Sequence, residues 1–536
     1  MPLSKPVRGF AVPAAAALLA LSCSSGPSGP SVRNGGTLHV ALDAEPASLD
    51  PLLANDTVSR RAYAPLFPLL YAANTDLSIG PDLAAALPSV GDGGKTLTVS
   101  LRSDAKWSDG MPITADDVVF TVDSERDPAL RAHAPSAWAG LQKVEKVDKS
   151  TVKFTLAADD ATFLASSLVT PIVPQHAYGK QTPAQIAAAA AAPSVTGGPF
   201  LLNHRDPGSI FLDANPGYFL GRPHMDHVVE TVTKDPAKVL DQLESGTLSW
   251  VPVLDPASAA AGASSPGVTV AAYPALALDG VMFNVRAGHM FADQLVRQAL
   301  AYSTAHDSLV AQATSAAQGY AVWGDVNPGS WAFTPSAATR YALDAGHARD
   351  LLGRAGWMQQ GGVATKGGQA LAADIIFPSS DASRSTAASL IATQAKASGF
   401  NLTPHGMDDG SFSSALTSGH FEAAVVALPT GVDPDDSAFL ATGAPENYGG
   451  YSNAALDALI AGERGAVPNG NQSQQQVREP IFDHIEQMVS SDLPLYFLWV
   501  PRQFTGFSAT VNGVAGTGAQ LDADRADTFY RDWFLL

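Results

Sequence analysis

The chain has 536 residues, a formal net charge of −19, 46% hydrophobic residues and 15% charged residues. Its length allows about two to four domains, and its hydrophobic content is too high for a globally disordered chain. The acidic balance argues against nucleic acid as a partner, because phosphates are bound by stripes of Lys and Arg. A single cysteine, Cys23, excludes a disulfide within the chain, a zinc site of cysteines and an iron–sulfur cluster.

The N-terminus predicts an export signal. Residues 1–22 contain two basic residues, no acidic residue and the apolar run Phe10 to Leu21, which is too short to cross a membrane. Cys23 and a Ser/Gly/Pro-rich tether over 23–34 follow. The whole segment resembles a bacterial lipoprotein signal and predicts lipidation of Cys23. The alternative is an ordinary cleaved signal with an incidental cysteine.

The next part of the chain shows strand patterns. Apolar residues alternate with others over 37–42, 96–101 and 151–156, which predicts antiparallel strands of a mixed α/β domain. A helix is expected to begin near residue 116, with Thr114 as its N-cap and two acids in its first turn.

Helical patterns dominate the later chain and alternate with strand patterns. This alternation predicts an α/β unit over about 275–495. Helices are expected at 292–301, 343–355, 383–398, 456–464 and 477–490, and strands at 373–377, 423–428 and 495–500.

Motifs of enzymes and metal sites are missing. The sequence contains neither G-x-S-x-G nor H-E-x-x-H. Gly94-Lys95-Thr96 imitates the end of a phosphate-binding loop, but a strand follows it, so we interpret it as a hairpin turn. His224 and His227 have the spacing of a metal pair without a third ligand nearby. We therefore expect no enzyme activity, no cofactor and no metal.

A run of motifs resembles the peptide/nickel-binding family (family 5) of solute-binding proteins, which serve ABC importers. It starts with the strand 96–102, continues with Ala105-Lys106-Trp107-Ser108-Asp109-Gly110 and ends with Pro112-Ile113-Thr114-Ala115-Asp116-Asp117-Val118. Further matches follow in the family's order over about 460 residues. They are 36–51, 172–178, 196–200, 281–284, 296–302, 348–357, 450–457 and 491–496.

The resemblance implies an α/β, two-lobe periplasmic-binding-protein fold with an extra subdomain in lobe I. Lobe I is expected at 35–273 with 499–536, and lobe II at 274–498. The two hinge strands should cross near Tyr273-Pro274 and Val500-Pro501, and closure of the hinge would bury the ligand. The implied partners are ABC permease subunits, and the family default is a monomer without chemistry of its own.

The resemblance also locates a ligand contact in lobe II. Many relatives bind a peptide's α-amino group with an aspartate three residues before an acidic-Pro pair. Here that pair is Asp433-Pro434, and Thr430 stands in place of the aspartate. Asp433 or its acidic neighbours are candidates for the charge role, and the alternative is a solvated acidic turn.

The other candidate ligand contacts lie on loops. Trp323 and Trp331 belong to a Gly/Pro-rich stretch that faces the cleft in relatives, with core packing as the alternative. An anion site is predicted where a strand meets a helix start, and a close backbone approach where glycines precede a proline. The residues of these two sites are Ser379, Ser380 and Arg384, and Gly197, Gly198 and Pro199.

We therefore expect a lipid-anchored, extracytoplasmic protein that captures oligopeptides or a related solute for an ABC importer. Peptide binders of this family usually hold the peptide backbone by strand-like hydrogen bonds, which tolerate many sequences. The alternatives are a surface sensor or docking protein of the same fold, or a carrier of a non-peptide ligand such as a metal chelate or haem.

Overall fold

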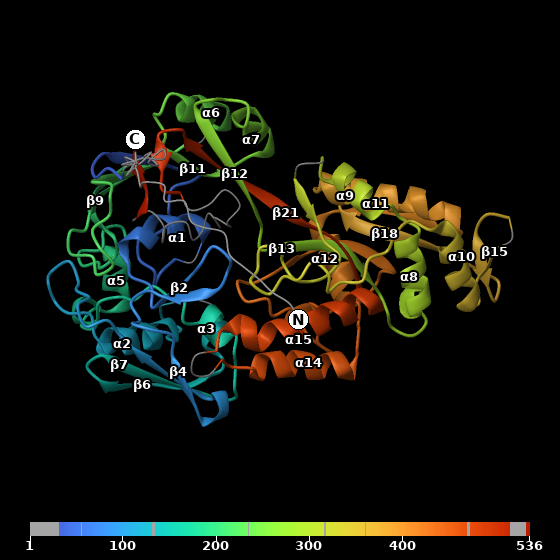
Figure 1. Cartoon of the computed structure of the whole chain (residues 1–536), viewed down its shortest axis with the longest axis horizontal. Coiled ribbons are helices and arrows are strands. Elements are labelled where there is room, and N and C mark those ends of the chain that lie inside the picture. Colours follow the sequence, from blue (N-terminus) through green and yellow to red (C-terminus); the bar gives the residue numbers. More distant parts are fainter. Residues whose placement is uncertain are drawn as a thin grey trace, which may run out of the picture.

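The molecule consists of two lobes, as the sequence predicts (Figure 1). They are joined by the strands β12 (Val268–Pro274), β13 (Ala277–Phe283) and β21 (Leu495–Ser508). The predicted signal and Cys23 lie outside the described residues. This computed structural model describes residues 32–535 except 55, 131–134, 234, 316–317, 360, 469–471 and 515–531.

Lobe I, as we use the name, comprises the elements up to β12, the second half of β21 and the two last short strands. Besides β12 its elements are β1 (Thr37–Leu42), α1 (Thr57–Tyr63), β2 (Tyr71–Ala73), β3 (Ile79–Pro81), β4 (Ser89–Gly91), β5 (Thr96–Ser100), α2 (Ala115–Glu125), β6 (Leu141–Asp148), β7 (Thr151–Leu156), α3 (Phe163–Ser166), α4 (Gln175–Tyr178), α5 (Pro183–Ala189), β8 (Phe200–Asp206), β9 (Ser209–Ala214), β10 (His227–Val232), α6 (Pro236–Glu244), β11 (Trp250–Leu254), α7 (Pro256–Gly262), β22 (Val511–Asn512) and β23 (Phe534–Leu535).

Lobe II comprises β13, the elements after it and the first half of β21. These elements are α8 (Gln294–Tyr302), α9 (His306–Ala313), β14 (Gly319–Ala321), α10 (Ala345–Arg354), β15 (Met358–Gln359), β16 (Ala364–Lys366), β17 (Gln369–Ala370), β18 (Ala372–Pro378), α11 (Ala382–Ala395), β19 (Asn401–Met407), α12 (Asp409–Ser418), β20 (Ala423–Pro429), α13 (Ser437–Leu440), α14 (Ala454–Gly465) and α15 (Gln474–Asp492).

One twelve-stranded sheet runs through both lobes in the order β19-β18-β20-β13-β21-β11-β1-β10-β9-β8, with β12 and β14 also paired to β21. The first half of β21 pairs with β13 and β14, and the second half pairs with β11 and β12. Strand β21 passes from lobe II to lobe I near Pro501, since Trp499 is opposite Asp279 of β13 and Arg502 is opposite Pro274 of β12. The chain therefore passes between the lobes along β21 and between β12 and β13.

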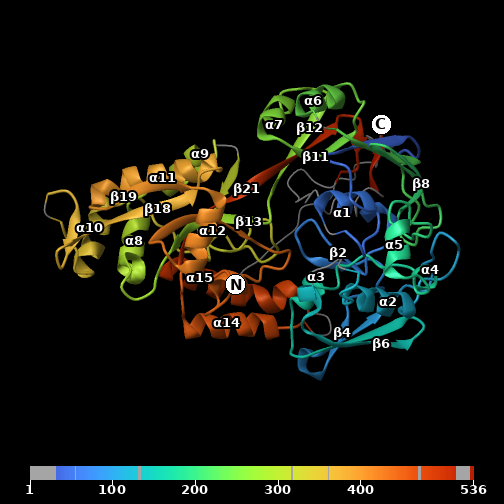
Figure 2. The same ribbon diagram turned by 180° about the vertical axis from the view of Figure 1, so that it is seen from behind.

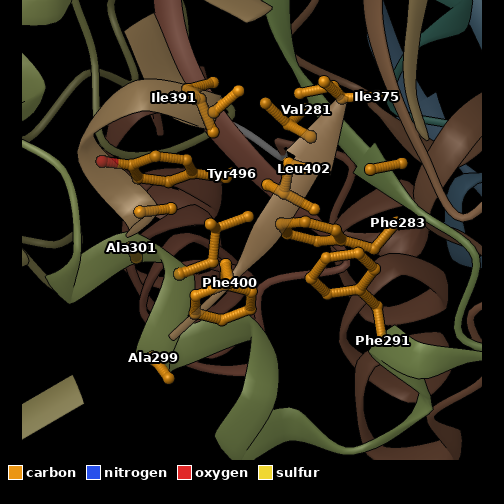
Figure 3. Close-up of a cluster of buried hydrophobic side chains, with 14 of the residues drawn as sticks. Val281, Phe283, Phe291, Ala299, Ala301, Ile375, Ile391, Phe400, Leu402 and Tyr496 are labelled. Atoms are coloured by element: carbon orange, nitrogen blue, oxygen red, sulfur yellow. The ribbon is translucent and has the colours of Figure 1, made fainter. Parts of the chain in front are cut away.

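The hydrophobic clusters divide the chain in the same region. Three clusters have all their buried members within 38–273 or at Phe507 and Trp533, and two have them within 278–500. A sixth, small cluster joins Ala73 and Leu77 of lobe I to Val432 of lobe II. In the larger core of lobe II, Figure 3 shows Phe283, Phe291 and Phe400 close together. The rings of Phe283 and Phe291 lie 4.6 Å apart. The domain limits remain a prediction. Close to them, buried side chains pass from the clusters of one lobe to those of the other.

The family motif around residue 110 forms a turn and a helix start in lobe I. Trp107 is buried in the core beside the separate sheet β4-β5-β7-β6. Gly110 has a φ of 84°, a conformation that favours glycine, and this allows the tight turn. Thr114 and Asp117 form a capping box at the start of α2, in which the Thr114 N–H donates to Asp117 Oδ2 at 2.7 Å. The predicted N-cap is confirmed.

Most predicted elements are found within a few residues of their expected bounds. The antiparallel pairing predicted for 37–42 is wrong, because β1 runs parallel to both of its neighbours, β10 and β11. The interpretation of Gly94-Lys95-Thr96 as a hairpin turn is confirmed by the antiparallel pair of β4 and β5. The expected end of the last strand at residue 500 is wrong, because β21 continues to Ser508. Pro501 lacks an N–H but stays in the strand, since its carbonyl accepts from Ala275 N at 2.8 Å.

Candidate ligand-binding cleft

The carboxyl ends of the parallel strands face the hinge from both lobes. In lobe I, β1 runs parallel to β10 and β11, and β11 runs toward the hinge along β21. In lobe II, β18 runs parallel to β19 and β20, and the end of β20 at Pro429 pairs with the start of β13 at Ala277. Ligands of open α/β sheets bind outside the carboxyl ends of the strands. The candidate ligand-binding cleft therefore lies between these two edges.

At the edge of lobe I the surface is hollowed. A cavity of about 250 Å³ lies beyond the ends of β1 and β11. The Arg61 side chain is 8% exposed in its wall, and its Nη1 lies 3.4 Å from Asp43 Oδ1. Sequence patterns do not predict this cavity, because their local signal is limited to the position of some of its residues after the ends of predicted strands. Its lining is Ala41, Leu42, Asp43, Arg61, Thr233, Val239, Val251, Pro252, Val253, Leu254 and Asp255.

At the edge of lobe II, Arg384 is held by acids of its own lobe. It occupies the first turn of α11 and donates from Nε to Asp279 Oδ1 at 2.7 Å, while Asp381 Oδ2 lies 3.6 Å away. Burial raises the pKa of Asp279 to about 6, although Arg384 opposes the rise. Acids of its own lobe therefore partly neutralise the charge of Arg384. Its role as an anion contact stays a prediction.

Ser379 and Ser380 extend the same edge. The Ser379 N–H donates to the carbonyl of Met407 at 2.7 Å, which continues the pairing of β18 with β19. The Ser380 hydroxyl donates to Asp409 Oδ1 at 2.9 Å, at the start of α12. Both serines lie at the carboxyl edge, and their hydrogen bonds go to the neighbouring strand and helix.

Thr430 and Asp433 differ in what surrounds them. The Thr430 N–H donates to the carbonyl of Leu276 at the hinge. Thr430 Oγ1 is buried and has no hydrogen-bond partner within the part of the chain that the structure describes. Asp433 accepts two hydrogen bonds from Arg478, at 2.6 and 2.7 Å. Asp433 is thus paired, not a solvated turn residue, and both of its oxygens are occupied.

Arg478 links this acid to a second one. It lies on α15 with a fully buried side chain and also donates to Glu463 of α14. Burial raises the pKa of Asp433, and Arg478 lowers it again. Arg478 and Glu463 were not predictable from the sequence, because a helix pattern does not tell which polar residue points inward.

The two tryptophans have different surroundings. The indole of Trp323 stacks on His306 at 3.6 Å and packs against the core of lobe II. The Trp331 N–H donates to the carbonyl of Asp76 in the β2–β3 turn of lobe I, at 2.9 Å. Its ring stands edge-on to Phe482. Trp331 therefore lies where the lobes meet, whereas Trp323 packs within lobe II.

The glycines at 197–198 are packed tightly inside lobe I. Both N–H groups donate to the carbonyl of Leu66, at 3.0 and 2.9 Å. The side-chain amide of Asn215 donates to the Gly198 carbonyl, and the Asn215 N–H donates to the Pro199 carbonyl. Ligand contact by this loop remains a prediction, because these hydrogen bonds are internal.

Replacing Gly198 by alanine is expected to destabilise the protein by about 1–3 kcal/mol, because of overpacking. A Cβ at Gly198 would overlap the carbonyl oxygen of Pro65 and lie 2.7 Å from the carbonyl carbon of Leu66. Urea unfolding measures the loss. Gly140→Ala is the matched control, since no atom lies within 4 Å of its Cβ position. Equal stability of Gly198→Ala and the wild type would contradict the packing role.

The two histidines with metal-pair spacing have separate partners. His224 Nδ1 lies 2.8 Å from Asn34 Oδ1, and His227 Nδ1 lies 2.7 Å from Asp213 Oδ1. Over the described ranges, no group of three or more His, Cys, Asp or Glu residues is arranged to hold a metal ion. Likewise, no helix among the described residues is long and apolar enough to cross a membrane.

Comparison with known proteins identifies the family. The model of bacterial extracellular solute-binding proteins, family 5 Middle, matches residues 78–450. Protein XP55 of Streptomyces lividans is 30% identical over 511 residues, which cover 92% of this chain and 90% of that protein. The oligopeptide-binding protein AppA of Bacillus subtilis is 25% identical over 497 residues, covering 90% and 89%.

Solved structures show the same fold. HbpA2 from Haemophilus parasuis superposes with a TM-score of 0.80 at 20% identity, covering 94% of this chain and all of that one. AppA of Bacillus subtilis, solved with a nonapeptide, superposes with a TM-score of 0.65 at 23% identity, with the same coverage. The chain belongs to family 5 of the bacterial extracellular solute-binding proteins, which bind their solutes and catalyse no reaction.

Proposed function

We propose that this chain is a lipid-anchored binding protein that captures oligopeptides, or a related solute, and delivers them to an ABC importer. The observation that carries the proposal is the pair of carboxyl edges that face each other across the hinge strands. The oligopeptide-binding relatives support a peptide as the solute. The lipid anchor is proposed from the sequence around Cys23, and a monomer is the family default.

Binding would use both edges together. The cavity of lobe I has mostly apolar walls with Arg61 and Asp43 at its side, which suits an apolar side chain beside a polar group. Lobe II would add the exposed part of Arg384 at the start of α11. Closure about the hinge would then cover the ligand from both sides.

A solute without a free amino group is the second candidate. Two of the three acids that follow Thr430 already have cations beside them. Asp433 pairs with Arg478, and Asp435 Oδ2 lies 3.2 Å from Arg464 Nη1. An incoming ammonium group would have to compete with these arginines.

Native mass spectrometry of the mature protein, before and after mild denaturation, tests the proposal. We expect a ladder of co-purified peptide masses that dissociate on denaturation, and we expect added peptides to raise the melting temperature. A ligand at 100 times its Kd stabilises the folded state by about 2.7 kcal/mol. A single non-peptide mass would favour the second candidate. A protein that carries no solute and is stabilised by no peptide would overturn the proposal.

A further inference from the structure

A second junction joins the lobes away from the hinge strands. Figures 1 and 2 both show α14 and α15 of lobe II lying against α3 and β4 of lobe I, on the opposite side of the molecule from β12 and β21. At the end of α14, Arg464 Nη2 lies 3.3 Å from Asp160 Oδ2 of lobe I. Its Nη1 lies 3.2 Å from Asp435 Oδ2 of lobe II. One guanidinium thus binds one carboxylate from each lobe.

The carboxylate in lobe I is held in place locally. Asp160 Oδ1 accepts from the N–H and the hydroxyl of Thr162, at 3.0 and 2.7 Å, which leaves Oδ2 directed at Arg464. The side chains of Asp160 and Asp435 are 21% and 14% exposed, and that of Arg464 is 40% exposed. Burial lowers the pKa of Arg464, but the two carboxylates more than offset this.

The backbones also meet at this junction. The Ala161 N–H of lobe I donates to the Arg464 carbonyl at 2.6 Å. A Cβ at Gly465 would lie 2.9 Å from Asp159 Oδ2, and a Cβ at Gly94 would lie 3.2 Å from Val467 Cγ2. The close approach therefore depends on small residues on both sides and leaves a cavity of only about 40 Å³ beside it.

We propose that the Arg464–Asp160 ion pair stabilises the arrangement of the two lobes seen here and breaks when the lobes move apart. A bend about the hinge strands displaces atoms most where they lie farthest from the hinge, and an ion pair is lost after a displacement of a few ångströms. Lobe movement therefore has to break this pair or remake it. This role of the Arg464–Asp160 pair depends on the two-lobe fold and not on the identity of the solute.

The test measures the distance between the lobes by single-molecule fluorescence transfer in the ligand-free protein. Donor and acceptor dyes are attached at Val147→Cys in lobe I and Leu343→Cys in lobe II, in the full chain with Cys23→Ser. Both positions are well exposed, at 57% and 56%. Arg464→Ala and Asp160→Asn are expected to change the population ratio of lobe arrangements by about two- to five-fold, which is the size of effect of a partly exposed ion pair.

The chain offers a matched control on the same guanidinium. Asp435→Asn removes the acid within lobe II and leaves the pair between the lobes, so its distance distribution should match the wild type. The double variant of Arg464→Ala with Asp160→Asn should change the distribution no more than either single variant, because both remove the same interaction.

If the distance distributions of Arg464→Ala and Asp160→Asn coincide with that of the wild type while both variants stay folded, the Arg464–Asp160 pair does not stabilise this arrangement of the lobes. If Asp435→Asn changes the distribution as much as Asp160→Asn, the effect arises within lobe II and the proposal also fails. The experiment uses no ligand, so its outcome is independent of whether the protein proves to carry peptides.

Discussion

Replacing Arg478 by alanine is expected to lower the free energy of unfolding by about 3–5 kcal/mol, because the change leaves buried carboxylates without their cation. Arg478 binds both oxygens of Asp433 and also Glu463, and its side chain is fully buried. Burial raises the pKa of Glu463 to about 7, and Arg478 opposes that rise. Urea unfolding of the two proteins at pH 7 measures the loss.

Two further variants separate the missing cation from a general effect of substitution. Arg354→Ala, at the exposed end of α10, should change stability by no more than about 0.5 kcal/mol. The triple variant of Arg478→Met with Asp433→Asn and Glu463→Gln should lose less free energy of unfolding than Arg478→Ala, because no unpaired charge remains in the cluster. An alanine variant as stable as the wild type would show that this ion cluster does not hold α14, α15 and the segment after β20 together.

The fold was largely predictable because its signals are local. Alternation over 151–156 needs only neighbouring residues to indicate a strand, and Thr114 needs only the next helical turn to act as a cap. The length of β21 was not predictable in this way. Its second half is held by β11 and β12, which lie more than 220 residues earlier, and no local pattern shows that pairing.

The candidate site was predictable only in part. Positions such as Ser380 and Arg384, where a strand meets a helix start, do lie at the carboxyl edge of lobe II. The partner of Arg384 was missed because Asp279 lies about a hundred residues earlier, on another strand. The charge role offered for Asp433 met the same difficulty, because Arg478 comes from a distant helix.

A group of buried carboxylates in lobe II makes stability depend on pH. Asp325, Asp436 and Glu486 are 2%, 6% and 1% exposed. Asp325 Oδ1 and Glu486 Oε2 have no hydrogen-bond partner within the described part of the chain. Burial, reinforced for Glu486 by the nearby Asp325 and Asp483, raises the pKa of Glu486 to about 9. Burial also raises the pKa of Asp325 to about 7.

These shifts fix the sign of the pH dependence. The Glu486 carboxyl holds its proton in the folded state up to about pH 9, whereas in the unfolded chain it loses the proton near its ordinary value of 4.5. Between these values the folded state binds the additional proton, so a rise in pH favours unfolding. The stabilisation is complete below the unfolded pKa and is lost as the pH rises through the folded pKa.

Glu486→Gln is therefore expected to make the protein more stable than the wild type at alkaline pH and to flatten the pH dependence. Glutamine imitates the protonated carboxyl and does not titrate. Between pH 7 and 8.5, the free energy of unfolding of the variant should therefore fall less steeply with pH than that of the wild type, by up to about 1.4 kcal/mol per pH unit. Urea unfolding at pH 5.5, 7 and 8.5 measures the slope. Glu479→Gln on the same helix is the control, because its side chain lies outside the buried group. A Glu486→Gln variant that is destabilised equally at all three values would mean that this carboxyl does not titrate with folding.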